Sequence, residues 1–221
     1  MKINIAIDGP SAAGKSTIAD ILAEKLGYTH LDTGAMYRAV AYKAFNNNIP
    51  IDDENAVVMM IEDMNLDMKS DGRVILDGED ITGKIRTNEI SMGASDVSKL
   101  LNVRAALVKM QQKICKDGGY ILDGRDITTV VLKDAPVKIF MTASAQARAK
   151  RRVEQNIEKG IEDSDYETIL KEIEKRDYQD SHRENSPLTK APDAVEIDTS
   201  NLSIEETLKI VNDLVKEKLG D

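Results

Sequence analysis

Apolar residues along the chain follow two alternating periods. Five short segments, most of them rich in apolar residues, have the length of strands and alternate with stretches in which apolar residues recur at helical spacing. They are residues 3–7, 29–31, 120–123, 137–141 and 194–197. This order is typical of parallel strands joined by helices. It predicts an α/β fold with a five-stranded parallel sheet and helices on both faces.

The starts of the helices are marked by residues that cap free backbone N–H groups. Thr33 is the expected N-cap of a helix that reaches residue 45, and Asp52 that of a helix that reaches residue 64. Longer helices are expected over residues 103–116 and 144–159. Capping boxes predict two more starts, at Ser164 with Glu167 and at Ser203 with Glu206.

Residues 65–86 interrupt the alternation of strands and helices. Their apolar residues alternate with polar ones around two Asp-Gly turns, which is typical of short antiparallel strands. We therefore expect a small meander inside an inserted subdomain, residues 39–103, with a single core formed by residues 1–38 and 104–221.

A glycine-rich motif lies between the first strand and the first helix. The sequence G-x-x-x-x-G-K-S at residues 9–16 is typical of the phosphate loop of P-loop NTPases when a strand precedes it and a helix follows, as here. Its backbone N–H groups and the helix N-terminus can surround a phosphate chain. The predicted ATP-binding residues are Gly9, Pro10, Ser11, Ala12, Ala13, Gly14, Lys15, Ser16 and Thr17. Lys15 is expected to reach the β and γ phosphates, and Ser16 to bind Mg²⁺.

Composition limits the partners of the chain. It has 221 residues, a formal net charge of −9 and one cysteine. The acidic balance argues against a nucleic-acid polymer or an anionic membrane as the main partner, and no run approaches the ~18 apolar residues of a membrane span. A single cysteine cannot form a disulfide within the chain, and the N-terminus enters a core strand without a signal peptide. We expect a cytoplasmic monomer.

Arginine is concentrated where a second anionic ligand is expected. Ten of the 30 basic residues are arginine, the side chain that best binds phosphate in a bidentate manner. Several of them lie at the carboxyl end of a strand, where open α/β sheets bind ligands, or on one face of a helix. The candidates are Arg38, Arg125, Arg148, Arg151, Arg152, Arg176 and Arg183.

Each of these assignments has a structural alternative. The three arginines within residues 148–152 could form a solvated helix face, and Arg125 could form an ion pair with Asp123 or Asp126. Asp123, at a strand end beside the phosphate loop, is a candidate Mg²⁺ ligand, in part through water, or a turn aspartate; Asp8 has the same two alternatives. The two histidines, His30 and His182, have no metal-ligand spacing and neither is assigned a metal.

Four groups of motifs together resemble the bacterial cytidylate kinases, a family of nucleoside-monophosphate kinases. The resemblance extends over essentially the whole chain and is carried by residues 7–17, by residues 31–38, by residues 122–126 with 134–140, and by Arg176-Asp177 with Arg183 and Pro187-Leu188. It implies an adenylate-kinase-like fold with a core, a monophosphate-binding subdomain and a short lid, residues 145–165. It also implies transfer of the γ-phosphoryl group from ATP to CMP or dCMP, with Mg²⁺.

The resemblance further implies which residues line the site. The monophosphate would be bound by Thr33, Arg38, Ser95, Arg104, Arg125, Asp126, Arg176, Asp180 and Arg183, and the catalytic residues would be Lys15, Arg125, Arg148, Arg152 and Arg176. Thr33 replaces a serine that is frequent in the family, with the hydroxyl kept. Arg148, Arg151 and Arg152 would clamp phosphates from the lid.

Hydrogen-bond chemistry supports the base preference that the resemblance implies. Cytosine offers an amino group at N4 and acceptors at N3 and O2, so a carboxylate such as Asp126 can accept from N4 and Arg104 can donate to the acceptors. Uracil would place a carbonyl against the carboxylate. Two alternatives stay open at this point: a kinase of the same fold for UMP, AMP or a small metabolite, and a nucleotide-binding regulator without turnover.

Overall fold

The computed structural model describes residues 2–158, 160 and 165–220. Within them, a five-stranded sheet has the order β2-β6-β1-β7-β8, and all of its pairings are parallel. The predicted fold class is therefore confirmed. The strands are β1 (Ile5–Asp8), β2 (Thr29–Asp32), β6 (Tyr120–Gly124), β7 (Val137–Thr142) and β8 (Val195–Asp198).

Helices cover both faces of this sheet. Ile5 and Ile7 of β1 pack into one buried cluster with residues of α1 (Lys15–Leu26) and α8 (Ile204–Leu219). Ala6 points to the other face, into a cluster with α2 (Thr33–Asn46) and α5 (Leu101–Ile114). Because neighbouring strand residues point to opposite faces, β1 has two buried sides, which explains its continuous apolar sequence.

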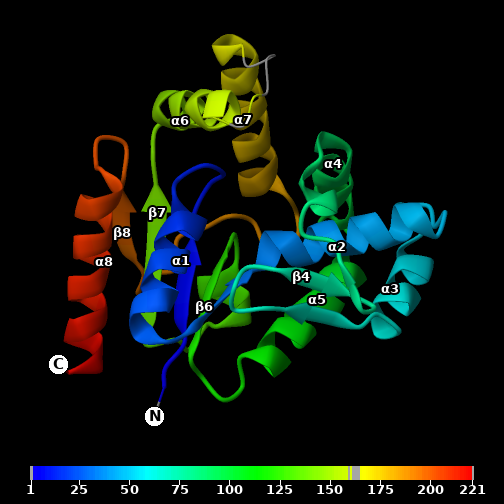
Figure 1. Cartoon of the computed structure of the whole chain (residues 1–221), viewed down its shortest axis with the longest axis horizontal. Helices are drawn as coiled ribbons and strands as arrows, with labels where there is room; N and C mark the ends of the chain where they lie inside the picture. Colours follow the sequence, from blue (N-terminus) through cyan, green and yellow to red (C-terminus); the bar gives the residue numbers. More distant parts are fainter. Residues whose placement is uncertain (1, 159, 161–164, 221) are drawn as a thin grey trace.

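The insertion lies at one side of the core (Figure 1). It contains the predicted antiparallel meander, β3 (Leu66–Met68), β4 (Val74–Leu76) and β5 (Glu79–Asp80), which confirms that part of the sequence interpretation. Two helices flank the meander, α3 (Glu54–Glu62) and α4 (Asn88–Val97). The helices α3 and α4 and strand β4 of the meander pack against α2.

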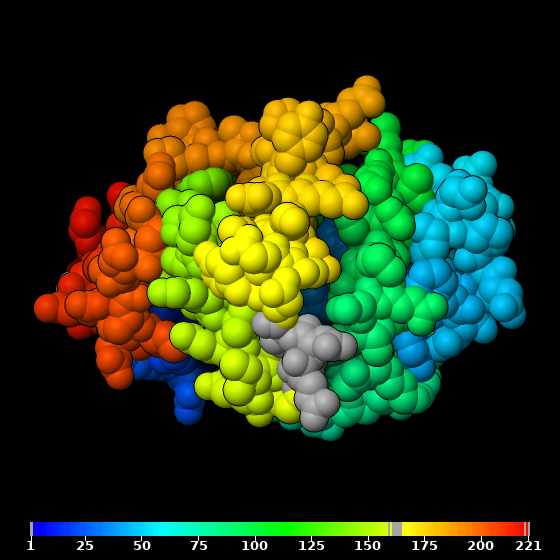
Figure 2. Space-filling model, turned by 90° about the horizontal axis from the view of Figure 1, so that it is seen from above, coloured from blue at the N-terminus to red at the C-terminus, as the bar shows by residue number. Residues whose placement is uncertain are grey.

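Two further helices stand over the carboxyl ends of the core strands, α6 (Ala145–Glu158) and α7 (Tyr166–His182) (Figure 1). They form a small apolar cluster of their own around Ala149, Ile169 and Ile173. Figure 2, which looks down on this edge, shows a gap in the surface between the yellow α7 and the green segment around α4, with blue N-terminal residues below it. The gap separates the helical pair from the insertion.

Several expected helix caps are wrong by one residue. Asp32, not Thr33, caps α2 by accepting from the backbone N–H of Ala35, and Asp53, not Asp52, caps α3. Thr33 does not cap because its hydroxyl donates elsewhere, to the carbonyl oxygen of Asp123. Asp165 caps α7, whereas the expected cap Ser164 lies outside the described residues.

The capping box of Ser203 with Glu206 at the start of α8 is confirmed. Among the described residues, no helix is long and apolar enough to cross a membrane.

Candidate active site

The phosphate loop connects the buried end of β1 to α1. Gly9 has a φ of 149°, and a Cβ built there would lie 1.8 Å from the carbonyl oxygen of Met141, so only glycine fits. Gly14 is left-handed, with a φ of 90°, and it caps α1 without a side-chain hydrogen bond. The first N–H groups of α1 therefore point into the loop, where they favour an anion.

Lys15 is buried in the middle of this loop. Its ammonium group donates to the carbonyl oxygen of Pro10 at 2.7 Å. Burial lowers its pKa to about 7, and repulsion by Arg125 and Arg176 contributes, against attraction by Asp123 and Asp8. A phosphate chain in the loop would stabilise the charged lysine, which is what the sequence interpretation requires of it.

Asp123 and Ser16 lie together at the foot of the loop. The Ser16 hydroxyl donates to Asp123 Oδ2 at 2.8 Å, which leaves the serine oxygen free to accept or to ligate. Burial opposes ionisation of Asp123, but hydrogen bonds from His30 and Ser16 and the charges of His30 and Lys15 lower its pKa to about 2. A hydroxyl oxygen and an ionised carboxylate are hard oxygen ligands that fit Mg²⁺ held together with substrate phosphates.

His30 is a member of this site that the sequence did not reveal. Its Nδ1 lies 2.6 Å from Asp20 Oδ1, and its Nε2 lies 2.8 Å from Asp123 Oδ1. The two histidines have no ligand spacing along the chain, and His30 reaches Asp123 only because β2 pairs with β6. That pairing is a long-range contact, so no local pattern could have predicted it.

The carboxylate of Asp8 binds backbone and side-chain donors of the protein, which fits a structural role rather than a metal ligand. Its carboxylate accepts from the backbone N–H groups of Ile127 and Thr128, at 2.8 and 2.7 Å, and from the Thr128 hydroxyl. Burial raises its pKa. These bonds fix the turn that follows Asp126. Asp8, which ends β1 just before the phosphate loop, therefore also holds the segment that carries Asp126.

A buried ion pair joins α5 to the turn after β6. Arg104 of α5 donates to Asp126, and the two side chains are 4% and 8% exposed. Arg104 also donates to the carbonyl oxygen of Ser98 at 3.1 Å, and its guanidinium lies 5.6 Å from the centre of the Tyr37 ring. The two residues expected to bind the base are therefore paired with each other and buried from solvent.

Arg125 is paired with neither of the aspartates considered from the sequence. Its Nε donates to Asp180 Oδ2 of α7 at 2.7 Å. Arg176 lies close by, and burial followed by repulsion from Arg125, Arg38 and Arg152 lowers its pKa to about 10. The predicted arginines of four different elements thus converge on one region of positive potential, which an anionic ligand would stabilise.

The three arginines of α6 have different partners. Arg148 is buried and donates to Asp177 at 2.9 Å and to the carbonyl oxygen of Ser11 at 3.3 Å, so it joins α7 to the phosphate loop. Arg151 donates to the hydroxyl and carbonyl oxygens of Thr199. Arg152 contributes to the positive potential at Arg176. A solvated helix face therefore does not describe this segment.

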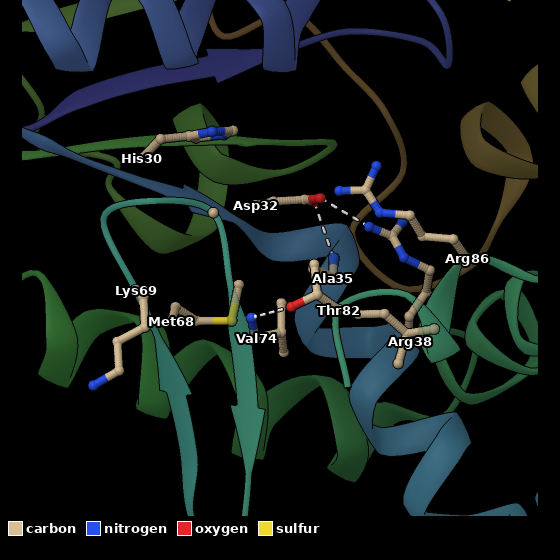
Figure 3. A pocket seen from close by; sticks show the side chains of 11 residues that line it. His30, Asp32, Ala35, Arg38, Met68, Lys69, Val74, Thr82 and Arg86 are labelled. Carbon is tan, nitrogen blue, oxygen red and sulfur yellow. Dashed lines mark hydrogen bonds and ion pairs between the residues drawn. The ribbon is translucent and has the colours of Figure 1, made fainter. Parts of the chain in front are cut away.

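Arg38 and the remaining acceptor-side residues surround the cluster. Arg38 Nη2 donates to Asp32 Oδ2 at 2.8 Å, and Ser95 lies half-buried on α4. Figure 3 shows the side chain of Arg86, which the sequence interpretation did not select, extending toward Asp32 beside Arg38. The small pocket drawn there adjoins a cleft of about 600 Å³ between α1 and the meander, and both are lined by His30 and Arg86.

These features define a class of protein. The strand, glycine loop and helix around a buried lysine are typical of a P-loop protein. The ionised aspartate beside a serine and the cluster of arginines are typical of a phosphotransferase that acts on a phosphorylated acceptor. The family model described as Cytidylate kinase matches residues 5–217. The chain belongs to the cytidylate kinase family, as predicted from its motifs.

Individual relatives agree. The chain is 55% identical over 216 residues to a protein named "Cytidylate kinase" from Caldicellulosiruptor bescii, covering 96% of this chain and 95% of the relative. It is 50% identical over 220 residues to a protein of the same name from Bacillus subtilis, covering 98% of each. A solved structure of an uncharacterized protein from Eubacterium ventriosum has a TM-score of 0.54 at 13% identity, covering 97% of this chain and 99% of that chain, and supports the fold alone.

Proposed function

We propose that this chain transfers the γ-phosphoryl group of ATP to CMP or dCMP, with ADP and CDP or dCDP as products. A phosphate oxygen of the acceptor forms a bond to the γ-phosphorus, and the bond between that phosphorus and the β–γ bridging oxygen breaks. The observation that carries the proposal is the buried Arg104–Asp126 pair. The pair lies close to Arg183, and Asp126 directly follows Arg125 in the chain.

The donor side would hold ATP through backbone and charge. The loop N–H groups and Lys15 bind the phosphate chain, and Lys15 gains charge stabilisation from it. Ser16 and Asp123 would hold Mg²⁺, Asp123 in part through water. When bound, the metal neutralises charge on the phosphates.

The acceptor side would neutralise a second phosphate. Arg125 and Arg38 lie close enough to Arg176 to lower its pKa, and Arg125 and Arg176 act in the same way on Lys15. The acceptor phosphate is already an anion at neutral pH, so the reaction needs positioning and charge neutralisation rather than a strong general base. Arg148 supports this arrangement indirectly, since it connects the loop to α7.

The base would be read by the Arg104–Asp126 pair. Two buried guanidinium nitrogens in this region, Arg104 Nε and Arg183 Nη2, have no hydrogen-bond partner among the described residues. Buried donors without acceptors fit a pocket that is completed by a polar ligand. Asp126 accepts from the N4 amino group of cytosine and Arg104 donates to N3 or O2, while Thr33, Ser95, Asp180 and Arg183 complete the lining toward sugar and phosphate.

The domain organisation, cellular location and oligomeric state belong to the same proposal. We infer a core of residues 1–38 and 104–221, a monophosphate-binding insertion of residues 39–103, and a lid of residues 145–165 that closes over the phosphates and excludes water. Cys115 is buried, and burial raises its pKa to about 12, which suits an unreactive thiol in a reducing cytoplasm. A monomer is sufficient, because the site is assembled from residues of one chain.

Product analysis tests phosphoryl transfer directly. The chain is incubated with Mg²⁺, CMP and ATP that is labelled in the γ-phosphate, and the nucleotides are separated. We expect the label in the β-phosphate of CDP in a one-to-one ratio with ADP. Label released only as inorganic phosphate, or no turnover with any monophosphate, would instead indicate a hydrolase or a regulator.

A further inference from the structure

A continuous chain of hydrogen bonds runs from the surface of α1 to the phosphate loop. It begins at Asp20, passes through His30 and Asp123, and ends at Ser16, with distances of 2.6, 2.8 and 2.8 Å. The outer member, Asp20, is 64% exposed, whereas the imidazole of His30 is 10% exposed. Neither Asp20 nor His30 has a task in the phosphoryl transfer described above.

Carboxylates hold the imidazole from two sides. Both ring nitrogens of His30 face carboxylate oxygens, which accept hydrogen bonds. The ring lies between Asp20 at the surface and Asp123 inside, so these two contacts fix its orientation.

The imidazole fixes how Asp123 presents its oxygens. Oδ1 accepts from His30 and Oδ2 accepts from Ser16, so the carboxylate plane is held from both sides. The bond to Oδ2 also turns the Ser16 hydroxyl hydrogen away from the phosphate loop. Both oxygen ligands of a cation in the loop therefore receive their orientation from a network that His30 closes.

The imidazole is not needed to hold the strands together. β2 and β6 are joined by a backbone ladder that pairs His30 with Ile121 and Leu31 with Leu122. The helix that carries Asp20 is fixed by its own buried residues, Ile18 and Leu22. Removing the imidazole leaves these contacts in place and releases chiefly Asp123, beside a cleft from which water can enter.

We infer that His30 is a positioning residue for the metal–nucleotide site: it orients Asp123, and through Asp123 Ser16, to bind the Mg²⁺ of MgATP. The inference rests on the proposed function for the presence of MgATP, and it goes beyond it by assigning a residue outside the loop to the metal. Loss of a partner that orients a metal ligand typically weakens metal binding by about 10–100-fold.

The test measures ATP binding without turnover. Calorimetric titrations of ATP are carried out in EDTA and at a series of Mg²⁺ concentrations, with no acceptor present. The variants are His30→Leu, which removes both donors, and His30→Gln, which keeps one donor toward Asp123. His182→Gln is the matched control, because His182 is the other histidine of the chain and lies exposed on α7.

The expected results separate positioning from a general loss of structure. We expect His30→Leu to reduce the gain in ATP affinity that Mg²⁺ provides by about 10-fold or more, with the affinity in EDTA unchanged. His30→Gln should recover most of the gain, and His182→Gln should match the unmodified chain. Equal loss in EDTA and in Mg²⁺, or an unchanged Mg²⁺ effect in His30→Leu, would overturn the inference.

A second variant keeps the test valid if His30→Leu does not fold. Asp20→Asn alters an exposed side chain of α1 and removes one of the two carboxylates that hold the imidazole. It should reduce the Mg²⁺ effect in the same direction by a smaller factor, and an unchanged effect would count against the inference. Since no acceptor is present, the outcome is independent of whether CMP is the monophosphate that is phosphorylated.

Discussion

In the proposed function, the Asp126 carboxylate accepts from the N4 amino group of cytosine, so Asp126→Asn tests how the chain distinguishes cytosine from uracil. The side chains of Asp126 and its partner Arg104 are 8% and 4% exposed, so an unmatched polar contact there is not relieved by water. In a dry site, such a mismatch discriminates by about 10⁴-fold, or about 5.5 kcal/mol at 1.36 kcal/mol for each factor of ten. The unmodified chain should therefore prefer CMP over UMP by up to about that ratio.

The asparagine side chain has nearly the same shape but different hydrogen-bond chemistry. Its NH₂ group can donate to O4 of uracil, while its oxygen can still accept from Arg104. We expect the ratio of kcat/KM for CMP to that for UMP to fall by at least about 10²-fold, through a loss for CMP and a gain for UMP. The measurement is the initial rate of ADP release over a range of each monophosphate at saturating ATP.

Stability has to be measured alongside these rates. Breaking a buried ion pair from one side costs about 3–5 kcal/mol, so Asp126→Asn should lower the melting temperature in the absence of nucleotide. Asp193→Asn is a suitable control, because Asp193 pairs with Lys138 of β7 and its side chain is 65% exposed. A folded Asp126→Asn variant with an unchanged CMP to UMP ratio would show that the base is read elsewhere.

The remaining predictions concern the phosphate loop and the arginine opposite it. Lys15→Ala and Arg125→Ala should each lower kcat by at least about 10²-fold, as losses of charge stabilisation in the transition state do, and near-normal turnover would remove that residue from the mechanism. Gly9→Ala places a Cβ against the carbonyl of Met141, so we expect a loss of stability of about 1–3 kcal/mol in chemical denaturation and weakened ATP binding. The buried Lys15 also predicts a pH effect, because folding lowers its pKa from 10.5 to about 7. Between these two pH values, Lys15 is protonated in the unfolded chain and largely deprotonated in the folded one. The stability of the folded chain without ATP should therefore rise with pH across that window. The rise should be smaller in Lys15→Met, and equal pH dependence in both chains would contradict the assigned cause.

Local sequence patterns predicted the parts of the fold that depend on local physics. The strand, loop and helix around Gly9, the meander of the insertion and the capping box at Ser203 are each encoded within a few residues. The expected N-cap of α2 was wrong by one residue because of a tertiary contact. Asp32 and Thr33 both carry capping oxygens, and only the pairing of β2 with β6 gives Thr33 another partner, the carbonyl oxygen of Asp123.

The site was predictable as a set of residue types but not as a set of contacts. The resemblance to the family implied Arg104 and Asp126 as site residues, whereas the pairing of Arg125 with Asp180 joins segments 55 residues apart. His30 gave no signal at all, since its partners come from α1 and β6. Such pairings depend on the register of the sheet and the packing of α7, which no local periodicity contains.

The most direct test of the account is the acceptor preference of the unmodified chain. Initial rates of ADP release are measured with MgATP and, in turn, CMP, dCMP, UMP, AMP and shikimate as acceptors. The account predicts the highest kcat/KM for CMP or dCMP, with UMP far lower and the others at background. A chain that phosphorylated UMP or AMP as well as CMP would contradict the role of the Arg104–Asp126 pair on which the proposed function rests.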